Sequence, residues 1–369
     1  MLNRWLAKRA ASSVPAPISV QPSQKFNGND GPWSSFPIQV GTPPQIVNVL
    51  VSTASSQTWA INPQGCTSSD PANCSISRGG FFQPNDSSTW KQNQDAANGL
   101  FPLVLETDLN VTGTGLYGYD TVSLSGQGSG GPTLDQQVVA SIATKGYYLG
   151  LLGLNPGSST LPGTSNEIPS FLSNLNQSNL IPSLSWSYTA GNQYRPGPVH
   201  GSLILGGYDS SRFEPNDVSF AFNNTASKDL VVHIGEIDLT TNDFITTLST
   251  DNESIAAFID STTPYIILPL NICEQFEQAF GIEWDDGVQA YLVNDTLHSA
   301  LQQGNTSVVF NIVDSSTVSG QGFNISLPYA AFDLVAGPPL LKNSSRYFPL
   351  MRASNDSEIT LGRTFLQEA

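Results

Sequence analysis

Residues 46–61 read IVNVLVSTASSQTWAI, an apolar strand-like run that enters a turn of small and hydroxylated residues and continues into a tryptophan. Residues 254–269, SIAAFIDSTTPYIILP, repeat this pattern in the second half of the chain. The second turn carries a carboxylate, Asp260, whereas the first has Ser52 at the matching place. The chain therefore builds the same unit twice and places an acid in only one copy.

A second pair of matching motifs follows the two turns at nearly equal spacing. Gly153 in GLLGL lies 101 residues after Ser52, and Gly362 in ITLGR lies 102 residues after Asp260. Repeated spacing of this kind predicts two similar lobes related by a pseudo-twofold axis, with the two turns meeting at the seam. Because clefts between lobes commonly hold binding sites, we expect the site at this seam.

The distribution of residue types predicts an all-β fold with few helices. Short apolar runs are separated by Gly, Pro, Asn or Asp, and only residues 165–180 and 271–281 are helical candidates. Residues 1–35 are rich in Ser, Pro and Gly, which predicts a flexible N-terminal arm. We expect an N-terminal β lobe over residues 36–190 and a C-terminal β lobe over residues 191–369.

The charge balance and the motif content exclude several classes of function. Acidic residues outnumber basic residues 30 to 14, which gives a net charge of −16. Such a surface repels phosphate backbones, so nucleic acid is not expected as a partner. No stretch approaches about 18 consecutive apolar residues, so no membrane span is predicted. No spacing of His, Cys, Asp or Glu suggests a metal site, and no cofactor is expected.

Sequons and cysteines predict a secreted or cell-surface glycoprotein. Asn-X-Ser/Thr sequons are about twice as frequent as the composition alone would give. Cys66 and Cys74 are close enough for a small disulfide loop in an oxidising compartment, which leaves Cys273 unpaired. No signal peptide is visible at the N-terminus, although Lys8 and Arg9 form a candidate dibasic processing site. The sequons begin at Asn73, Asn85, Asn110, Asn176, Asn223, Asn252, Asn294, Asn305, Asn324, Asn343 and Asn355.

Taken together, the two turns and their paired glycine motifs resemble the pepsin-like aspartic peptidases. FPIQVGTPPQ (36–45), GYDTVSL (118–124) and GSLILGGYDSSRF (201–213) fall in the order of that family, so the resemblance covers nearly the whole chain from Phe36. It implies a bilobal fold of two six-stranded-type β lobes around a central cleft, and a monomer. In the family more strand follows the point where this chain stops, so the resemblance implies a truncated C-terminal end.

The family's chemistry requires two aspartates that act on one water and share a proton, because like charges a few ångströms apart cannot both ionise. By comparison with the family, Asp260 is the surviving catalytic acid and Ser52 stands at the position of the lost one. A serine hydroxyl does not accept a proton at acidic or neutral pH. The resemblance therefore implies a secreted, catalytically inactive pseudo-peptidase whose cleft binds a peptide or protein, with a glycan as a further candidate ligand.

Three other readings remain open. The first is an active aspartic-type endopeptidase that works at acidic pH with a Ser52–Asp260 dyad. The second is a cell-surface structural glycoprotein with no cleft ligand. In the third, a serine hydrolase, Ser52 would be the nucleophile, but the chain has only three histidines and no Gly-X-Ser-X-Gly elbow.

The resemblance also implies roles for neighbouring residues. Thr53 and Ser261 keep the hydroxyls that in the family bond across the seam. Ala54 and Thr262 replace the glycines of the family's two turns, and a β-branched threonine resists the close backbone approach that glycine allows. Ser55, Thr263 and Trp59 are expected to support the cleft.

The flap, a hairpin that covers the cleft in this family, departs from the family pattern. Thr112 precedes Gly113-Thr114-Gly115 where the family has a tyrosine, and the hairpin is about four residues shorter than expected from the comparison with the family. Tyr117 is the alternative candidate for the missing tyrosine.

Overall fold

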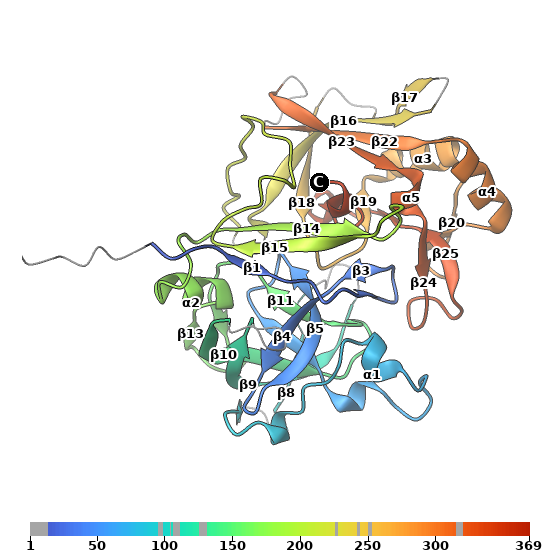
Figure 1. Ribbon diagram of the computed structural model, residues 1–369. Coiled ribbons are helices and arrows are strands. Elements are labelled where there is room, and N and C mark those ends of the chain that lie inside the picture. Colours follow the sequence, from blue (N-terminus) through green and yellow to red (C-terminus); the bar gives the residue numbers. More distant parts are fainter. Residues whose placement is uncertain are drawn as a thin grey trace, which may run out of the picture.

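The computed structural model describes residues 14–94, 99–103, 105, 111–124, 131–225, 228–241, 244–249, 253–314 and 320–369. These residues form two β-rich lobes, the first mostly blue to green and the second mostly yellow to red (Figure 1). The all-β, bilobal architecture predicted from the sequence is confirmed.

The first lobe is built on an eight-stranded sheet in the order β10-β6-β11-β5-β4-β9-β7, with β8 paired to β9. In β4, Phe36, Ile38 and Val40 are fully buried, whereas Pro37 and Gln39 are half-buried. Large apolar side chains at every second position favour a strand with one face in the core. The strands are β4 (Phe36–Val40), β5 (Gln45–Ser52), β6 (Thr58–Ile61), β7 (Lys91–Gln92), β8 (Leu100–Pro102), β9 (Thr114–Ser123), β10 (Thr133–Ile142) and β11 (Gly150–Gly153).

The second lobe has a sheet of the same size, in the order β23-β22-β16-β18-β27-β19-β26, with β17 paired to β16. Each lobe thus has an eight-stranded sheet, not the six-stranded type that the resemblance implied. The strands are β16 (Val231–Thr240), β17 (Ile245–Thr247), β18 (Ile255–Ile259), β19 (Ile266–Leu268), β22 (Ser307–Val313), β23 (Gly322–Pro328), β26 (Leu350–Arg352) and β27 (Thr360–Leu361).

The two sheets share one topology around the turns. In the first lobe, β11 lies between β5 and β6, parallel to β5 and antiparallel to β6. In the second lobe, β27 lies between β18 and β19, parallel to β18 and antiparallel to β19. Each Gly-ending strand thus separates the strand before a turn from the strand after it. This is the pseudo-twofold relation that the equal spacing predicted.

A third sheet, in the order β1-β15-β14, combines β1 (Ile18–Val20), β15 (Val199–Leu205) and β14 (Trp186–Asn192). The predicted flexible arm over residues 1–35 is wrong for residues 14–35, which contain β1, β2 (Phe26–Asn27) and β3 (Trp33–Ser34); residues 1–13 lie outside the described residues. The reason is that Ile18 pairs with Leu205, a long-range contact that local composition does not encode. The expected boundary between residues 190 and 191 falls inside β14.

Short helices and small sheets complete the lobes. The predicted helices near 165–180 and 271–281 are present as α2 and α3, and α3 ends at Gly281, whose φ of 66° is the left-handed conformation that glycine favours. The helices are α1 (Cys74–Ser77), α2 (Phe171–Gln177), α3 (Leu270–Phe280), α4 (Asp295–Gln303) and α5 (Tyr329–Phe332). The remaining strands are β12 (Ser159–Thr160), β13 (Glu167–Ile168), β20 (Glu283–Asp285), β21 (Ala290–Leu292), β24 (Leu334–Ala336) and β25 (Ser345–Phe348).

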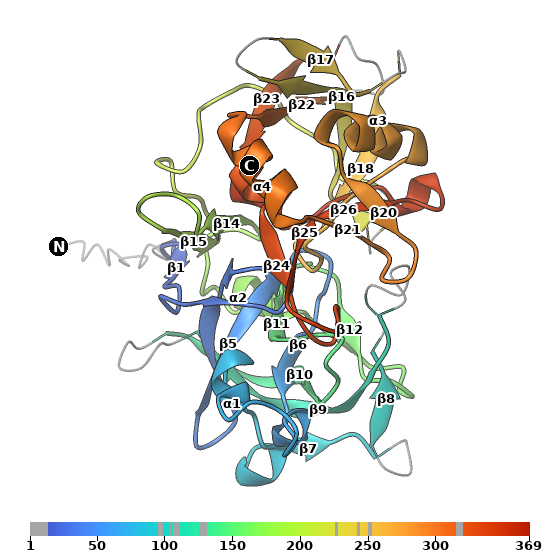
Figure 2. The same cartoon turned by 90° about the vertical axis from the view of Figure 1, so that its right-hand side faces the viewer.

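The hydrophobic core has one cluster in each lobe and a third that joins them. The joining cluster contains Trp59 and Leu151 from the first lobe and Leu334 and Tyr347 from the second. Figure 2 shows β24 and the loop after it reaching from the second lobe down to the first. There the Gly337 N–H donates to the Asn29 carbonyl at 2.7 Å, so the lobes meet along a packed seam.

Candidate active-site turns and interlobe cleft

Ser52 and Asp260 occupy equivalent places in the two lobes. Ser52 ends β5 and pairs with Gly153 of β11. Asp260 directly follows β18, and its N–H donates to the carbonyl of Leu361, the residue before Gly362. The same strand register therefore places the serine and the aspartate at corresponding points of their turns.

The paired glycines are required because each turn packs directly on them. A Cβ on Gly153 would lie 2.4 Å from the Ser55 carbonyl oxygen, and a Cβ on Gly362 would lie 2.5 Å from the Thr263 carbonyl oxygen. Side chains cannot approach main-chain oxygens this closely. Both lobes thus use a glycine to bring a strand against the turn, which explains the glycine motifs found in the sequence.

Thr53 and Ser261 join the two turns across the seam. The Thr53 N–H donates to Ser261 Oγ and the Ser261 N–H donates to Thr53 Oγ1, each at 3.0 Å. The two hydroxyls then donate to the opposite lobe, Thr53 to the Ile259 carbonyl at 3.1 Å and Ser261 to the Val51 carbonyl at 2.7 Å. The structure therefore brings these two residues together in a reciprocal, fully buried network.

The Ser52 hydroxyl oxygen has a hydrogen-bond partner in each lobe. Its oxygen lies 2.7 Å from Thr262 Oγ1 and accepts from the Ser55 N–H at 3.0 Å. Ser52 has no exposed surface, and Asp260 is 5% exposed. The Thr262 N–H donates to Asp260 Oδ1 at 2.8 Å, so one residue contacts both the serine hydroxyl and the carboxylate. The two turns present one carboxylate and a set of hydroxyls.

Ser55 and Thr263 support the turns in equivalent ways. Ser55 Oγ accepts from the Gln57 N–H at 3.0 Å, and Thr263 Oγ1 accepts from the Tyr265 N–H at 3.3 Å. Each hydroxyl bonds two residues ahead along its own chain, which is a common way for such side chains to fix a turn. Both residues therefore stabilise the turn from within and are buried.

Tyr117 and Trp59 lie on the flap side of the first turn. Tyr117 Oη donates to Gln57 Oε1 at 3.1 Å, and Trp59 Nε1 donates to the same oxygen at 2.9 Å. Burial raises the pKa of Tyr117, so its hydroxyl stays protonated. Thr112 is exposed, and its carbonyl accepts from the Thr144 hydroxyl at 3.4 Å. Of the two flap candidates, only Tyr117 joins this group.

Arg363 is a component of the site that sequence reasoning missed. Its guanidinium is 2% exposed and donates to the Ser261 and Thr262 carbonyls at 2.9 and 2.5 Å. It also pairs with Asp30 Oδ2 at 2.5 Å and lies over the Trp33 ring. The only signal in the sequence is a cation directly after Gly362, and its partner Asp30 lies in the segment predicted to be flexible.

Beside the second turn, a cavity of about 240 Å³ lies between the lobes. Its walls include Leu50 and Tyr148 from the first lobe and Thr262, Tyr265 and Leu340 from the second. Burial raises the pKa of Tyr265, so its phenol is neutral across the physiological range. The cavity is therefore mostly apolar with a few polar groups, as binding sites commonly are.

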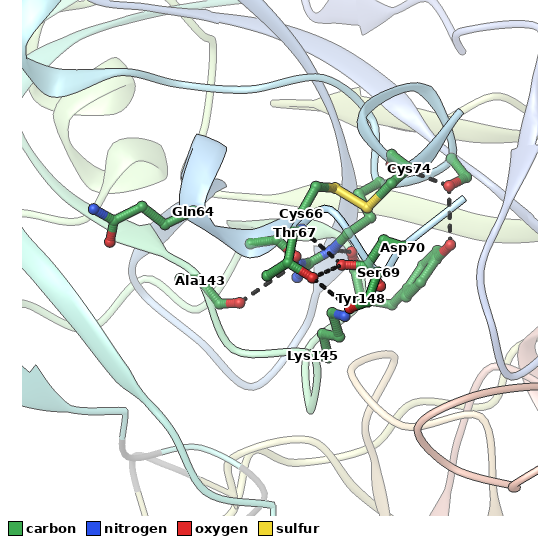
Figure 3. Close-up of a disulfide and its surroundings, with 12 residues drawn as sticks. Gln64, Cys66, Thr67, Ser69, Asp70, Cys74, Ala143, Lys145 and Tyr148 are labelled. Carbon is green, nitrogen blue, oxygen red and sulfur yellow. Dashed lines mark hydrogen bonds and ion pairs between the residues drawn. A yellow bond between two sulfur atoms is a disulfide. The ribbon is translucent and has the colours of Figure 1, made fainter. Parts of the chain in front are cut away.

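The predicted disulfide between Cys66 and Cys74 is confirmed (Figure 3). Cys273 is free and has no exposed surface, and burial raises the pKa of its thiol to about 12. A buried thiol of this kind is unreactive at neutral pH, because the thiolate is the nucleophile.

Most of the predicted glycosylation sites lie at the surface. Eight sequon asparagines are exposed and Asn176 is half-buried, whereas Asn110 and Asn252 lie outside the described residues. Within the described residues there is no cluster of three or more His, Cys, Asp or Glu side chains arranged for a metal ion. In the same part of the chain, no helix is long and apolar enough to cross a membrane.

Comparisons with known proteins agree with this geometry. The sequence model of the family described as "Eukaryotic aspartyl protease" matches residues 35–369. Secreted aspartic protease 8 of Candida albicans is 26% identical over 344 residues, which cover 92% of this chain and 73% of that protein. Candidapepsin of Candida tropicalis is 25% identical over 348 residues, with 92% and 76% covered.

A solved structure extends the likeness to the fold. The aspartic proteinase from Irpex lacteus matches with a TM-score of 0.59 at 19% identity, covering 95% of this chain and 92% of that one. The family match includes both turns and both paired glycines. With two lobes of matching topology and two turns joined across their seam, the chain belongs to the eukaryotic aspartyl protease family.

Proposed function

We propose that this chain is a secreted, catalytically inactive member of the family that binds an extended peptide or protein segment in the interlobe cleft. The observation that carries the proposal is the state of Ser52, which lies at the equivalent of Asp260 but has no exposed surface and is bonded to Thr262 and Ser55. A hydroxyl held in this way supplies neither the charge nor the proton acceptor that a pair of carboxylates supplies.

The loss of one acid has a large expected effect on rate. General acid–base groups each contribute about 10²–10⁴ in rate, and groups that act as a unit are not additive. Losing one member of a proton-sharing pair should therefore remove at least ~4 kcal/mol of transition-state stabilisation. Asp260 would also lack the like-charged neighbour that gives the family its acidic optimum.

Peptide binding is supported by the parts of the cleft that do not depend on the dyad. The cavity draws its walls from both lobes, and the Thr53–Ser261 network keeps the lobes in register. Leu340, which is 39% exposed, gives the cavity an accessible apolar edge. An apolar cavity of this kind suits apolar side chains of an extended chain.

Secretion is supported by three independent features. The family relatives named above include a secreted aspartic protease. The Cys66–Cys74 disulfide suits an oxidising compartment. Most described sequon asparagines are exposed, where a glycan can be attached.

The test combines cleavage and binding on the purified full chain. Denatured casein is incubated with the wild-type chain and with Asp260→Asn between about pH 2 and pH 5, the range in which a carboxylate pair would share a proton. We expect no cleavage by either protein. Cleavage by the wild type that is abolished by Asp260→Asn and by a statine-containing inhibitor would establish an active peptidase with a Ser52–Asp260 dyad.

Binding is measured with extended synthetic peptides that carry one apolar side chain at each position in turn. We expect some of them to raise the thermal midpoint of the wild type, because a ligand of the folded state stabilises it. Leu340→Asp should abolish the shift, whereas Leu270→Asp, at an exposed leucine at the start of α3, should not. No shift with any peptide would overturn the binding proposal and favour a structural glycoprotein.

A further inference from the structure

Arg78 is a buried cation without a carboxylate partner among the contacts the structure gives it. Its side chain is 1% exposed and lies just after α1, on which it is the C-cap residue. Burial lowers its pKa, and the nearby Asp70 and Tyr148 only partly oppose this effect. A fully buried charge is costly unless many hydrogen bonds compensate it. The groups that accept hydrogen bonds from Arg78 therefore indicate its structural role.

The guanidinium donates to five main-chain carbonyl oxygens. Nε donates to Tyr148 at 2.9 Å, Nη1 to Gly65 at 2.8 Å and to Ala143 at 3.5 Å, and Nη2 to Thr144 at 2.6 Å and to Tyr147 at 2.9 Å. Four of these carbonyls belong to one short segment, residues 143–149, which we call the wall segment. The planar guanidinium fixes the relative positions of the carbonyls it binds, as a flexible ammonium would not.

The wall segment forms part of the interlobe cleft. Residues 146–149, Tyr147 and Tyr148 among them, line the cavity beside the second turn. The Tyr148 ring also lies against the guanidinium, 5.7 Å from its carbon. Arg78 thus holds the main chain of a segment that lines the cavity.

The disulfide loop covers Arg78 and is tied to the same segment. In Figure 3 the Cys66–Cys74 bridge lies above Asp70, which forms an ion pair with Lys145 of the wall segment. That pair lowers the pKa of Asp70 to about 2, so it persists at mildly acidic pH. Tyr148 Oη adds a hydrogen bond to Ser77 Oγ at 3.0 Å.

Gly65 shows how closely the loop is fitted over the guanidinium. A Cβ at Gly65 would lie 2.4 Å from Arg78 Nη1. The disulfide fixes Cys66, the next residue, to Cys74 at the start of α1, and α1 ends at Ser77, directly before Arg78. The bridge therefore holds both the carbonyl above Arg78 and the helix that carries it.

From this arrangement we propose that Arg78 is a positioning residue for peptide binding, which sets the conformation of the wall segment, and that the Cys66–Cys74 disulfide keeps Arg78 in place. The effect on binding rests on the proposed function, whereas the effect on the wall segment does not. Arg78 does not touch the ligand and acts through Tyr147 and Tyr148.

Limited trypsin digestion measures how readily the wall segment opens, because trypsin cleaves after Lys145, which lies within it. In the wild type the bond after Lys145 should resist cleavage relative to the bond after Arg212, in an exposed segment of the second lobe. In Arg78→Lys the ammonium cannot reach all five carbonyls. Since one lost charge-assisted bond is worth about 1.5–3 kcal/mol, cleavage after Lys145 should speed up at least about tenfold if local opening limits it. The Arg212 rate should stay unchanged.

Two further variants keep the test decisive. Cys66→Ser/Cys74→Ser removes the bridge but keeps Arg78, and should also speed cleavage after Lys145. Arg212→Lys, at an exposed arginine, should leave the Lys145 rate unchanged. Equal rates at Lys145 in the wild type, Arg78→Lys and the cysteine variant would overturn the proposal, as would parallel increases at Lys145 and Arg212, which indicate global destabilisation.

The binding arm uses the apolar peptide that gives the largest thermal shift with the wild type. Arg78→Lys should weaken its binding at least about tenfold, on the same estimate of one lost charge-assisted bond. Unchanged binding despite faster cleavage after Lys145 would overturn the role in binding. If no peptide binds the wild type, the proposed function fails, and the cleavage rates still decide whether Arg78 positions the wall segment.

Discussion

The Ser52 hydroxyl lies 2.7 Å from the Thr262 hydroxyl, and both residues are buried. This contact joins the end of β5 in the first lobe to the turn after β18 in the second. Thr262 also donates its N–H to the carboxylate of Asp260. Thr262 thus contacts both the hydroxyl of Ser52 and the carboxylate of Asp260. The turn that ends β5 and the turn after β18 are therefore physically coupled through Thr262.

Placing an acid at position 52 alone should give little activity. Ser52→Asp would place a carboxylate in a buried site, in contact with the Thr262 side chain. We expect at most weak cleavage of denatured casein at acidic pH by this variant. Adding Ala54→Gly and Thr262→Gly should raise the rate, because glycine allows the two turns a closer backbone approach.

The rates are measured for the single and triple variants, each with and without Asp260→Asn. Activity that survives Asp260→Asn would come from a contaminant. Full activity from Ser52→Asp alone would show that Thr262 does not obstruct the site.

The reciprocal network between the turns should contribute measurably to stability. Ser261→Ala removes the oxygen that accepts from Thr53 and the hydroxyl that donates to Val51, and leaves both main-chain groups buried. An unsatisfied buried group costs about 1–3 kcal/mol, so the free energy of unfolding should fall by roughly that amount. Denaturant unfolding measures it, with Ser183→Ala at an exposed serine as a control that should change little. A loss no larger than that of the control would contradict this view of the seam.

The paired glycine of the second lobe should not tolerate a methyl group. In Gly362→Ala the new Cβ would meet the Tyr265 and Thr263 carbonyl oxygens at 2.4 and 2.5 Å, both on main chain that packing holds in place. We expect a destabilisation at or above the upper end of the ~1–3 kcal/mol typical of overpacking. Gly337→Ala is the matched control, since its Cβ would meet no atom within 4 Å. Similar thermal midpoints for the two variants would refute the role of Gly362.

Much of the fold could be predicted because its signals are local and repeated. The strand before each turn, the turn itself and the later glycine recur in both halves, so the spacing alone predicts that Ser52 and Asp260 lie at equivalent places. Residues 36–40 alternate buried and half-buried positions, which is visible in the sequence as well. The helix α4 was missed although Asn294 caps it in the usual way, by accepting from the Leu297 N–H at 2.9 Å.

Other parts could not be predicted because their partners are distant or are main-chain atoms. Strand β1 depends on Leu205, far away in the sequence, so its Ser/Pro-rich surroundings indicated only a flexible arm. Arg363 forms an ion pair with Asp30, which lies near the other end of the chain. Arg78 binds carbonyl oxygens, which every residue has, so no pattern of side chains reveals it.

Thiol reactivity should distinguish the three cysteines. The native chain should not react with iodoacetamide at neutral pH, because Cys273 is buried with a raised pKa and the other two are bridged. After denaturation without reductant, mass spectrometry should find one alkylated cysteine per chain, and three when reductant is added. Three without reductant would show that the bridge is absent in the purified protein, and rapid labelling of the native chain would contradict the burial of Cys273.

The pair formed by Arg363 and Asp30 should be the most sensitive ionic contact near the site. Arg363→Met would leave the Asp30 carboxylate, which is 14% exposed, without its cation, and would leave the Ser261 and Thr262 carbonyls without their donor. Removing one partner of a buried pair costs about 3–5 kcal/mol, so a loss of that size is expected in the free energy of unfolding.

A double-mutant cycle with Asp30→Asn tests whether the pair itself causes this loss. Because the carboxylate left behind is part of the cost, Asp30→Asn/Arg363→Met should lose less stability than the two single variants combined, with a coupling of about 1–3 kcal/mol. Additive losses would mean that Arg363 acts only through the second turn and not through Asp30. That outcome would remove the physical reason for linking the N-terminal segment to the turn that carries Asp260, whereas strong coupling would make this segment a structural part of the site.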